Sequence, residues 1–146
     1  MTDRIIHTNW DIRFLDLAAH VAGWSKDPNT KVGAVIVNDQ KQILSVGYNG
    51  FPRGVEDRVS RYEDRATKLL FVAHAERNAL DNAYTDVRGA TLYSTLCPCN
   101  ECAKSIVQKG IKRVVSYSPP YEIVEKFNIG TTRILFREGK VEFVLV

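Results

Sequence analysis

One histidine and two cysteines occur at a spacing that suits a zinc ion. His74-Ala75-Glu76 is the first motif, and the segment 98–102, Pro-Cys-Asn-Glu-Cys, is the second and contains Cys99 and Cys102. Imidazole and thiolate groups are typical zinc ligands, and a zinc ion with three protein ligands keeps a fourth position open for water, as catalytic sites do. Glu76 is two residues from His74 and is not expected to be a ligand, so its carboxylate is free to move protons.

This combination suits the hydrolytic removal of an amine from a pyrimidine ring. Zinc lowers the pKa of its bound water to about 7, which provides a nucleophile at neutral pH. The ring nitrogen and the departing amine must each receive a proton, and one mobile carboxylate can make both transfers. The pattern H-x-E followed by P-C-x-x-C is that of zinc nucleobase deaminases. We therefore predict Glu76 as the catalytic residue and His74, Cys99 and Cys102 as the ligands of one Zn²⁺.

A purely structural zinc site is one alternative. It would require a fourth ligand, and Cys97 is the nearest candidate. Because Cys97 ends a predicted strand before a proline, we expect its side chain to point away from the other two cysteines. A non-catalytic zinc module that senses nucleotides is a second alternative, and the presence of Glu76 argues against it.

The composition predicts one globular domain, 1–146. Hydrophobic residues make up 45% of the 146 residues and charged residues 25%, as in ordinary globular proteins. The net charge of +3 suits an anionic small molecule and is too small to predict a nucleic-acid partner. No apolar stretch approaches the roughly 18 residues of a membrane span, and the first ten residues do not resemble a signal peptide. With all three cysteines clustered between 97 and 102, we expect a cytoplasmic protein without disulfides.

Hydrophobic periodicity predicts an α/β fold. Strands are predicted at residues 31–37, 42–48, 90–96, 111–117 and 141–146, and helices at residues 9–26, 69–84, 98–109, 119–127 and 134–138. A short turn makes the first two strands an antiparallel hairpin, and the strand-helix-strand order after residue 90 implies parallel pairing. The prediction is a three-layer α/β/α sandwich with a mixed five-stranded sheet. Residues 56–68 are highly charged without clear periodicity, which leaves an exposed helix and a mobile loop both open.

The zinc motifs resemble those of the cytidine deaminase superfamily, and three segments resemble the deoxycytidylate (dCMP) deaminases. These segments are 27–34 (Asp-Pro-Asn-Thr-Lys-Val-Gly-Ala), 47–54 (Gly-Tyr-Asn-Gly-Phe-Pro-Arg-Gly) and 99–104 (Cys-Asn-Glu-Cys-Ala-Lys). The resemblance implies the conversion of dCMP to dUMP for thymidylate synthesis. The zinc motifs alone fit other substrates as well, such as cytidine, deoxycytidine, guanine or tRNA adenosine.

The resemblance also implies roles for individual residues and partners. The substrate-binding residues would be Thr30 and Lys31 near the 5′-phosphate, Asn49 on the deoxyribose, Gly33, Ala34 and Ala75 on the pyrimidine, and Tyr121 as a cover. Members are often homo-hexamers that dCTP activates and dTTP inhibits, with a regulatory nucleotide and Mg²⁺ at Asn49, Gly50, Phe51, Arg53 and Gly54. Val55-Glu56-Asp57 replaces a cysteine and paired aspartates usual in the family. The chain lacks cysteines for a second, structural zinc, so one zinc per subunit is expected.

Overall fold

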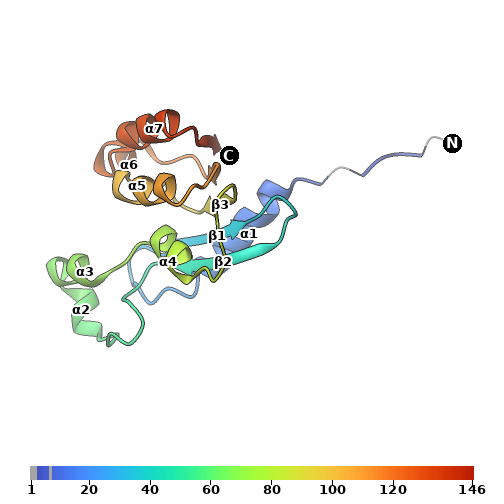
Figure 1. Ribbon diagram of the computed structural model, residues 1–146. Helices are drawn as coiled ribbons and strands as arrows, with labels where there is room; N and C mark the ends of the chain where they lie inside the picture. The colour runs from blue at the N-terminus through green and yellow to red at the C-terminus, as the bar shows by residue number, and fades with distance from the viewer. Residues whose placement is uncertain (1–2, 7) are drawn as a thin grey trace.

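A five-stranded sheet forms the centre of the computed structural model, which describes residues 3–6 and 8–146 (Figure 1). Its strand order is β2-β1-β3-β4-β5. The strands are β1 (Gly33–Val37), β2 (Ile43–Tyr48), β3 (Thr91–Ser94), β4 (Arg113–Ser116) and β5 (Glu142–Leu145). β1 runs antiparallel to both β2 and β3, whereas β3, β4 and β5 run parallel to one another. The predicted mixed sheet, with parallel pairing after residue 90, is confirmed.

Helices cover both faces of the sheet. α1 (Trp10–Ala22) packs on one face, and α4 (Ala75–Asn82), α5 (Asn100–Gln108) and α7 (Ile129–Glu138) pack on the other. Alternating strand residues separate the two cores, so that Val35 and Tyr93 face α1 while Ile36 and Leu92 face the opposite layer. This arrangement confirms the predicted three-layer α/β/α sandwich. None of the helices in the described part of the chain is long and apolar enough to cross a membrane.

Two glycines allow helices to lie unusually close to the sheet. A Cβ atom at Gly47 in β2 would stand 2.3 Å from the backbone nitrogen of Ala79 in α4, and one at Gly33 in β1 would stand 2.0 Å from the carbonyl oxygen of Ala18 in α1. Neither distance is compatible with a side chain, so both positions require glycine. The close approach at Gly47 fixes α4, which carries Glu76, directly against β2.

The predicted helix 69–84 is wrong, because the chain forms two helices there. α3 (Arg65–Phe71) ends before Val72, and α4 begins at Ala75. Between them Ala73 forms a backbone bridge with Gly50, in which the Ala73 nitrogen is 2.8 Å from the Gly50 oxygen and the Gly50 nitrogen is 3.1 Å from the Ala73 oxygen. This long-range pairing takes the backbone groups of Ala73 out of any helix, although residues 69–73 are all apolar.

Other helices differ from prediction at their ends. α1 ends at Ala22 and not near residue 26, and α7 begins at Ile129, five residues before the predicted start. α6 (Tyr121–Lys126) lies inside the predicted range 119–127. The undecided segment 56–68 contains α2 (Val59–Glu63) and the start of α3, and Figure 1 shows these two helices together at one end of the molecule.

Candidate zinc site and substrate cavity

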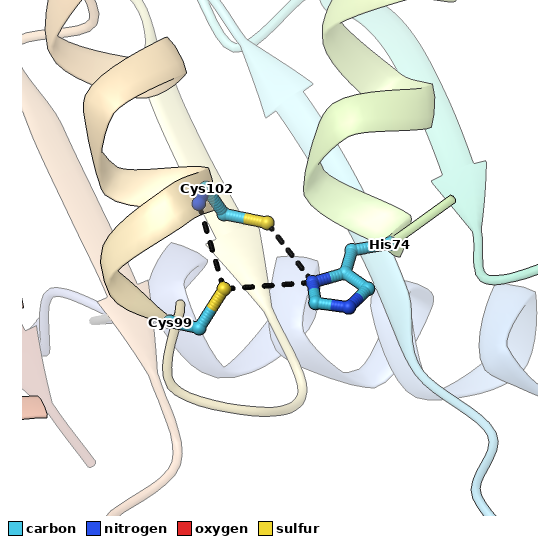
Figure 2. A group of neighbouring side chains, drawn as sticks. All are labelled: His74, Cys99 and Cys102. Carbon is cyan, nitrogen blue, oxygen red and sulfur yellow. Dashed lines mark hydrogen bonds between the residues drawn. The ribbon is translucent and has the colours of Figure 1, made fainter. Parts of the chain in front are cut away.

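Two helix N-termini bring the three predicted zinc ligands together (Figure 2). His74 is the N-cap of α4, Cys99 is the N-cap of α5, and Cys102 lies in the first turn of α5. The Nδ1 atom of His74 is 3.2 Å from the Cys102 Sγ and 3.5 Å from the Cys99 Sγ. All three ligand atoms lie within 4.8 Å of one another.

The donor set and spacing fit zinc. Ligand atoms about 2.1 Å (nitrogen) and 2.3 Å (sulfur) from a tetrahedral zinc ion would be separated from one another by roughly 3.6 Å. Among the described residues, the group has three members, and Cys97 is not one of them. Burial raises the pKa of the Cys97 thiol to about 11, which is the opposite of what a ligand thiolate requires.

The surroundings of Cys99 favour its thiolate. The hydrogen bond from the Cys102 side chain, with a smaller effect of His74, lowers the pKa of Cys99 to about 4 against the effect of burial. The backbone N–H of Cys102 also donates to the Cys99 sulfur over 3.5 Å. The interaction with Cys99 raises the pKa of Cys102 in turn. A divalent cation would stabilise both thiolates at once.

Glu76 lies in the first turn of α4, beside the ligand group, and its side chain is buried. Burial raises the pKa of its carboxyl, and His74, Cys102 and Ser94 offset this effect only in part. The Oε1 atom of Glu76 is 3.0 Å from the Ser94 hydroxyl oxygen. A buried carboxyl with a raised pKa next to a metal group is typical of a residue that takes up and releases protons.

A cavity opens beside this group, between α3 and the end of α6. His74, Ala75, Glu76 and Cys99 contribute its metal end, and Arg65, Lys68 and Lys126 contribute positive charges. The other lining residues are Asp27, Thr30, Val32, Asn49, Leu69, Val72, Leu96, Cys97 and Phe127. A cavity that combines apolar walls, three cations and a metal group suits a small anionic molecule with an aromatic ring.

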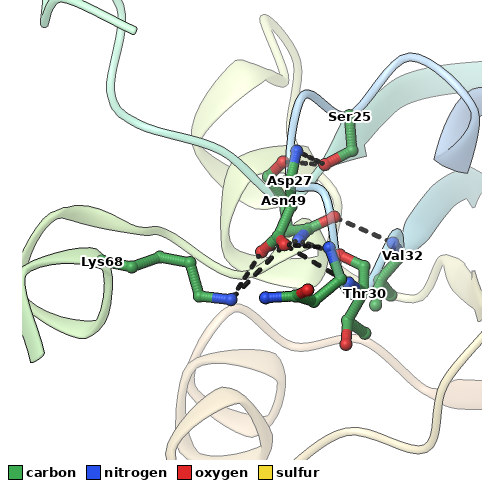
Figure 3. Close-up of polar contacts among 7 residues, drawn as sticks. Ser25, Asp27, Thr30, Val32, Asn49 and Lys68 are labelled. Carbon is green, nitrogen blue, oxygen red and sulfur yellow. Dashed lines mark hydrogen bonds and ion pairs between the residues drawn. The ribbon is translucent and has the colours of Figure 1, made fainter. Parts of the chain in front are cut away.

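Asp27 organises the wall of the cavity formed by residues 25–32 (Figure 3). Its Oδ1 accepts hydrogen bonds from the backbone N–H groups of Asn29 (2.9 Å) and Thr30 (3.3 Å). Asn49 braces the same segment, because its Oδ1 accepts from the Val32 N–H at 2.8 Å and its Nδ2 donates to the Thr30 carbonyl at 2.8 Å. These hydrogen bonds connect the segment 25–32 to Asn49, the residue after β2, so that the two form one rigid wall.

Lys68 ties α3 to this wall. Its Nζ lies 3.2 Å from the Asp27 Oδ2, and both side chains are almost fully buried. Burial by itself would raise the pKa of Asp27, but the N–H groups of Asn29 and Thr30 together with Lys68 outweigh burial, and the pKa is lowered. Asp27 is thus held as a carboxylate whose charge is fully partnered.

The predicted substrate residues are only partly brought together. Thr30, Asn49 and Ala75 line the cavity, whereas Gly33 and Ala34 of β1 follow the lining residue Val32 and do not line the cavity. The Nζ of Lys31 instead donates to the Ser25 carbonyl, and Tyr121 is 84% exposed at the start of α6. Neither Lys31 nor Tyr121 lines the cavity in this structure, and their roles in binding stay predictions.

The predicted regulatory loop is anchored at several points. Gly50 makes the bridge to Ala73, and the Phe51 ring stacks on Tyr62 of α2 with a centroid distance of 4.2 Å. Arg53 donates to the Asn82 side chain at 3.2 Å. Gly54 has a φ of 86°, a conformation that favours glycine. The loop therefore contacts α2, α4 and the residue before His74.

Several residues of the site were not predicted from the sequence, among them Arg65, Lys68, Ser94, Lys126 and Phe127. Ser94 could have been predicted from the sequence, since it is a polar residue in a mostly apolar predicted strand. Arg65 and Lys68 of α3 could not, because residues 56–68 are rich in charges and their conformation was left open.

The fold and the His-Cys-Cys group together are those of a zinc-binding deaminase. Residues 8–118 match the family model for the cytidine and deoxycytidylate deaminase zinc-binding region, and the chain belongs to this family.

Relatives and solved structures agree with this assignment. The chain is 42% identical over 143 residues to the deoxycytidylate deaminase of Homo sapiens, covering 94% of this chain and 79% of the human protein. It is 40% identical over 121 residues to the deoxycytidylate deaminase of Mycobacterium phage D29, covering 73% and 93% of the two chains. The crystal structure of dCMP deaminase from the cyanophage S-TIM5, in complex with dCMP and dUMP, superposes with a TM-score of 0.74 at 26% identity, covering 96% of this chain and 100% of the phage chain.

Proposed function

We propose that this protein is a deaminase that hydrolyses dCMP to dUMP and ammonia, and so supplies dUMP for thymidylate synthesis. The observation that carries the proposal is the meeting of the His-Cys-Cys group with buried Glu76 at one end of a cavity lined by cations. Relatives at about 40% identity are deoxycytidylate deaminases, and the similar phage enzyme was crystallised with dCMP and dUMP.

Each residue has a defined part in this reaction. His74, Cys99 and Cys102 would hold one zinc ion per subunit, which when bound supplies a nucleophilic water at neutral pH. The water oxygen becomes the 4-carbonyl oxygen of dUMP while the bond from C4 to the amine breaks. Of the two water protons, one goes to N3 of the ring and one to the departing amine. Glu76 carries both protons in turn, because it is the carboxylate next to the metal group.

Nucleotide binding is assigned to the cavity walls. The backbone around Gly33 and Ala34 and the start of α4 at Ala75 would hold the pyrimidine, and Asn49 the deoxyribose. The 5′-phosphate would lie near Thr30 and Lys31, with Tyr121 closing over the substrate. Arg65 and Lys126 add positive charge to the cavity, whereas the charge of Lys68 is balanced by Asp27, and this positive charge favours a phosphorylated substrate over a free nucleoside.

A substrate panel tests the proposal. Zinc-loaded protein is incubated with dCMP, deoxycytidine, cytidine and dCTP, and ammonia release is measured. We expect dCMP to have the highest kcat/KM. Turnover of the nucleosides without turnover of dCMP would overturn the substrate assignment. A zinc-loaded protein that turns over none of these compounds would overturn the assignment as a cytidine-type deaminase.

Regulation, assembly and location complete the proposal. By family resemblance, the chain would form a homo-hexamer in the cytoplasm, activated by dCTP and inhibited by dTTP, with Mg²⁺ at the loop Asn49–Gly54. Support comes from the contacts that link this loop to Ala73, the residue before His74. Light scattering would measure the assembly, and dCMP saturation curves with each effector and Mg²⁺ would measure the regulation. Curves unchanged by either nucleotide would remove the regulatory part of the proposal.

A further inference from the structure

Ser94 occupies a position that neither the zinc motifs nor the substrate walls include. It is the last residue of β3, is fully buried, and faces the same side of the sheet as Leu92, toward α4 and α5. Its hydroxyl oxygen has two close partners, the Glu76 Oε1 at 3.0 Å and the Leu96 carbonyl oxygen at 2.8 Å. The hydroxyl therefore joins the catalytic carboxyl to the backbone just before Cys97.

The hydrogen-bonding capacity of a serine makes this arrangement informative. A hydroxyl has one hydrogen to donate and two lone pairs that accept, whereas a backbone carbonyl only accepts. The Ser94 oxygen lies within hydrogen-bond distance of both the Glu76 carboxyl and the Leu96 carbonyl, and the pairing of β3 with β1 and β4 fixes where Ser94 stands. A fixed partner 3.0 Å from Oε1 limits the positions that the Glu76 carboxyl can take.

We propose that Ser94 is a positioning residue, which holds the Glu76 carboxyl in one place beside the His-Cys-Cys group. The inference rests on the proposed function, because that function makes Glu76 the catalytic residue. Other buried strand serines differ in this respect. Ser45 and Ser116 each bond to a backbone carbonyl, at 2.6 Å and 3.1 Å, and neither contacts a carboxylate.

The chain offers a closely matched control. Ser116 is the neighbour of Ser94 in the parallel pair β3–β4, and it is also fully buried. Ser116→Ala and Ser94→Ala remove the same group from adjacent strands on the same face of the sheet. Ser94→Thr and Ser94→Val form a second matched pair, since they have nearly the same shape and only the threonine keeps a hydroxyl.

Steady-state kinetics with dCMP on zinc-loaded variants give the first measurement. We expect Ser94→Ala to lower kcat by about ten- to a hundredfold, with little change in KM, because a misplaced catalytic group loses rate rather than binding. Ser116→Ala should keep the wild-type kcat, and Ser94→Thr should exceed Ser94→Val. Equal losses in Ser94→Ala and Ser116→Ala, or equal rates for the threonine and valine variants, would overturn the proposal.

Crystal structures of the zinc-loaded variants give a second measurement that is independent of turnover. The Glu76 carboxyl should keep its position in Ser94→Thr and move in Ser94→Ala. An unmoved carboxyl in Ser94→Ala would overturn the proposal. If the wild-type protein fails to turn over dCMP, the proposed function fails, and these structures still decide whether Ser94 positions Glu76.

Discussion

Glu76 and Asp27 are two carboxylates that line the same cavity and are almost equally buried, with 4% and 3% of their surfaces exposed. Their pKa values nevertheless shift in opposite directions. Burial raises the pKa of Glu76, and its neighbours offset burial only in part. Burial also acts to raise the pKa of Asp27, but two backbone N–H groups and Lys68 reverse the sign.

The difference shows that hydrogen-bond donors, together with the depth at which a carboxyl lies below the surface, decide what a buried carboxyl does. One carboxylate oxygen of Asp27 accepts from two backbone N–H groups and the other pairs with Lys68, so Asp27 stays ionised. It therefore anchors residues 25–32 and α3. Glu76 receives a single hydroxyl contact and lies next to the His-Cys-Cys group, so proton uptake is much easier there. One cavity thus contains a carboxyl that anchors the structure and a carboxyl whose surroundings suit proton transfer.

Glu76→Gln gives the largest expected effect, since it keeps the size of the side chain and removes its ability to carry a proton. We expect kcat with dCMP to fall by about 10²- to 10⁴-fold, the usual contribution of general acid–base catalysis. The zinc-to-protein ratio should not change. The control is Glu101→Gln, which alters an exposed glutamate of α5 that pairs with Lys104. A Glu76→Gln enzyme with nearly wild-type kcat would show that Glu76 is not the proton carrier.

Lys68→Met tests the other carboxyl by leaving Asp27 without its cation. Removing one partner of a buried ion pair costs about 3 kcal/mol or more in free energy of unfolding. Urea denaturation would measure the loss, with the double variant Asp27→Asn, Lys68→Met as the comparison. The double variant should be more stable than Lys68→Met, because it no longer buries an unpaired charge. A single variant as stable as the wild type would show that the pair does not anchor α3.

Asp27→Asn is expected to change how stability depends on pH. Since folding lowers the pKa of Asp27 below its ordinary value of 3.8, the contribution of Asp27 to stability is present above that value and is lost as pH falls through the lower, folded value. Between about pH 5 and pH 3, the wild type should therefore lose more free energy of unfolding than Asp27→Asn. Urea titrations across this range would measure both curves. Parallel curves would mean that Asp27 has the same pKa in the folded and unfolded chains.

Lys26→Ala gives the smallest expected effect. Lys26 and Asp57 form an ion pair at 2.7 Å, but the lysine side chain is 64% exposed. Exposed pairs contribute little, because water and salt screen them. Thermal unfolding should give the same midpoint as the wild type within error. A clearly lower midpoint would show that an exposed ion pair can contribute to the stability of this protein without being buried.

The sequence predicted the chemical end of the cavity far better than its walls. His74, Glu76, Cys99 and Cys102 lie in two short motifs whose spacing follows from ligand chemistry, and the structure brings the three ligands together. The five strands were also predicted, because apolar β-branched runs bounded by turns depend mainly on local sequence.

The walls depend on contacts between distant segments, which local patterns do not contain. The helix predicted over residues 69–84 was wrong because Ala73 pairs with Gly50, a partner 23 positions away. Lys68 lies in a segment rich in charges, and its burial depends on Asp27, 41 residues earlier. Tyr121 was placed over the substrate by resemblance, whereas the structure leaves it 84% exposed.

The bridge between Gly50 and Ala73 has a consequence for local opening of the fold. Its two backbone hydrogen bonds connect the loop after β2 to the residue that precedes a metal ligand. The amide hydrogens of Gly50 and Ala73 should therefore exchange with solvent together, as parts of one cooperative unit. Opening of the loop would release the backbone beside His74, so we expect loss of metal from the proposed site to accompany opening of the loop.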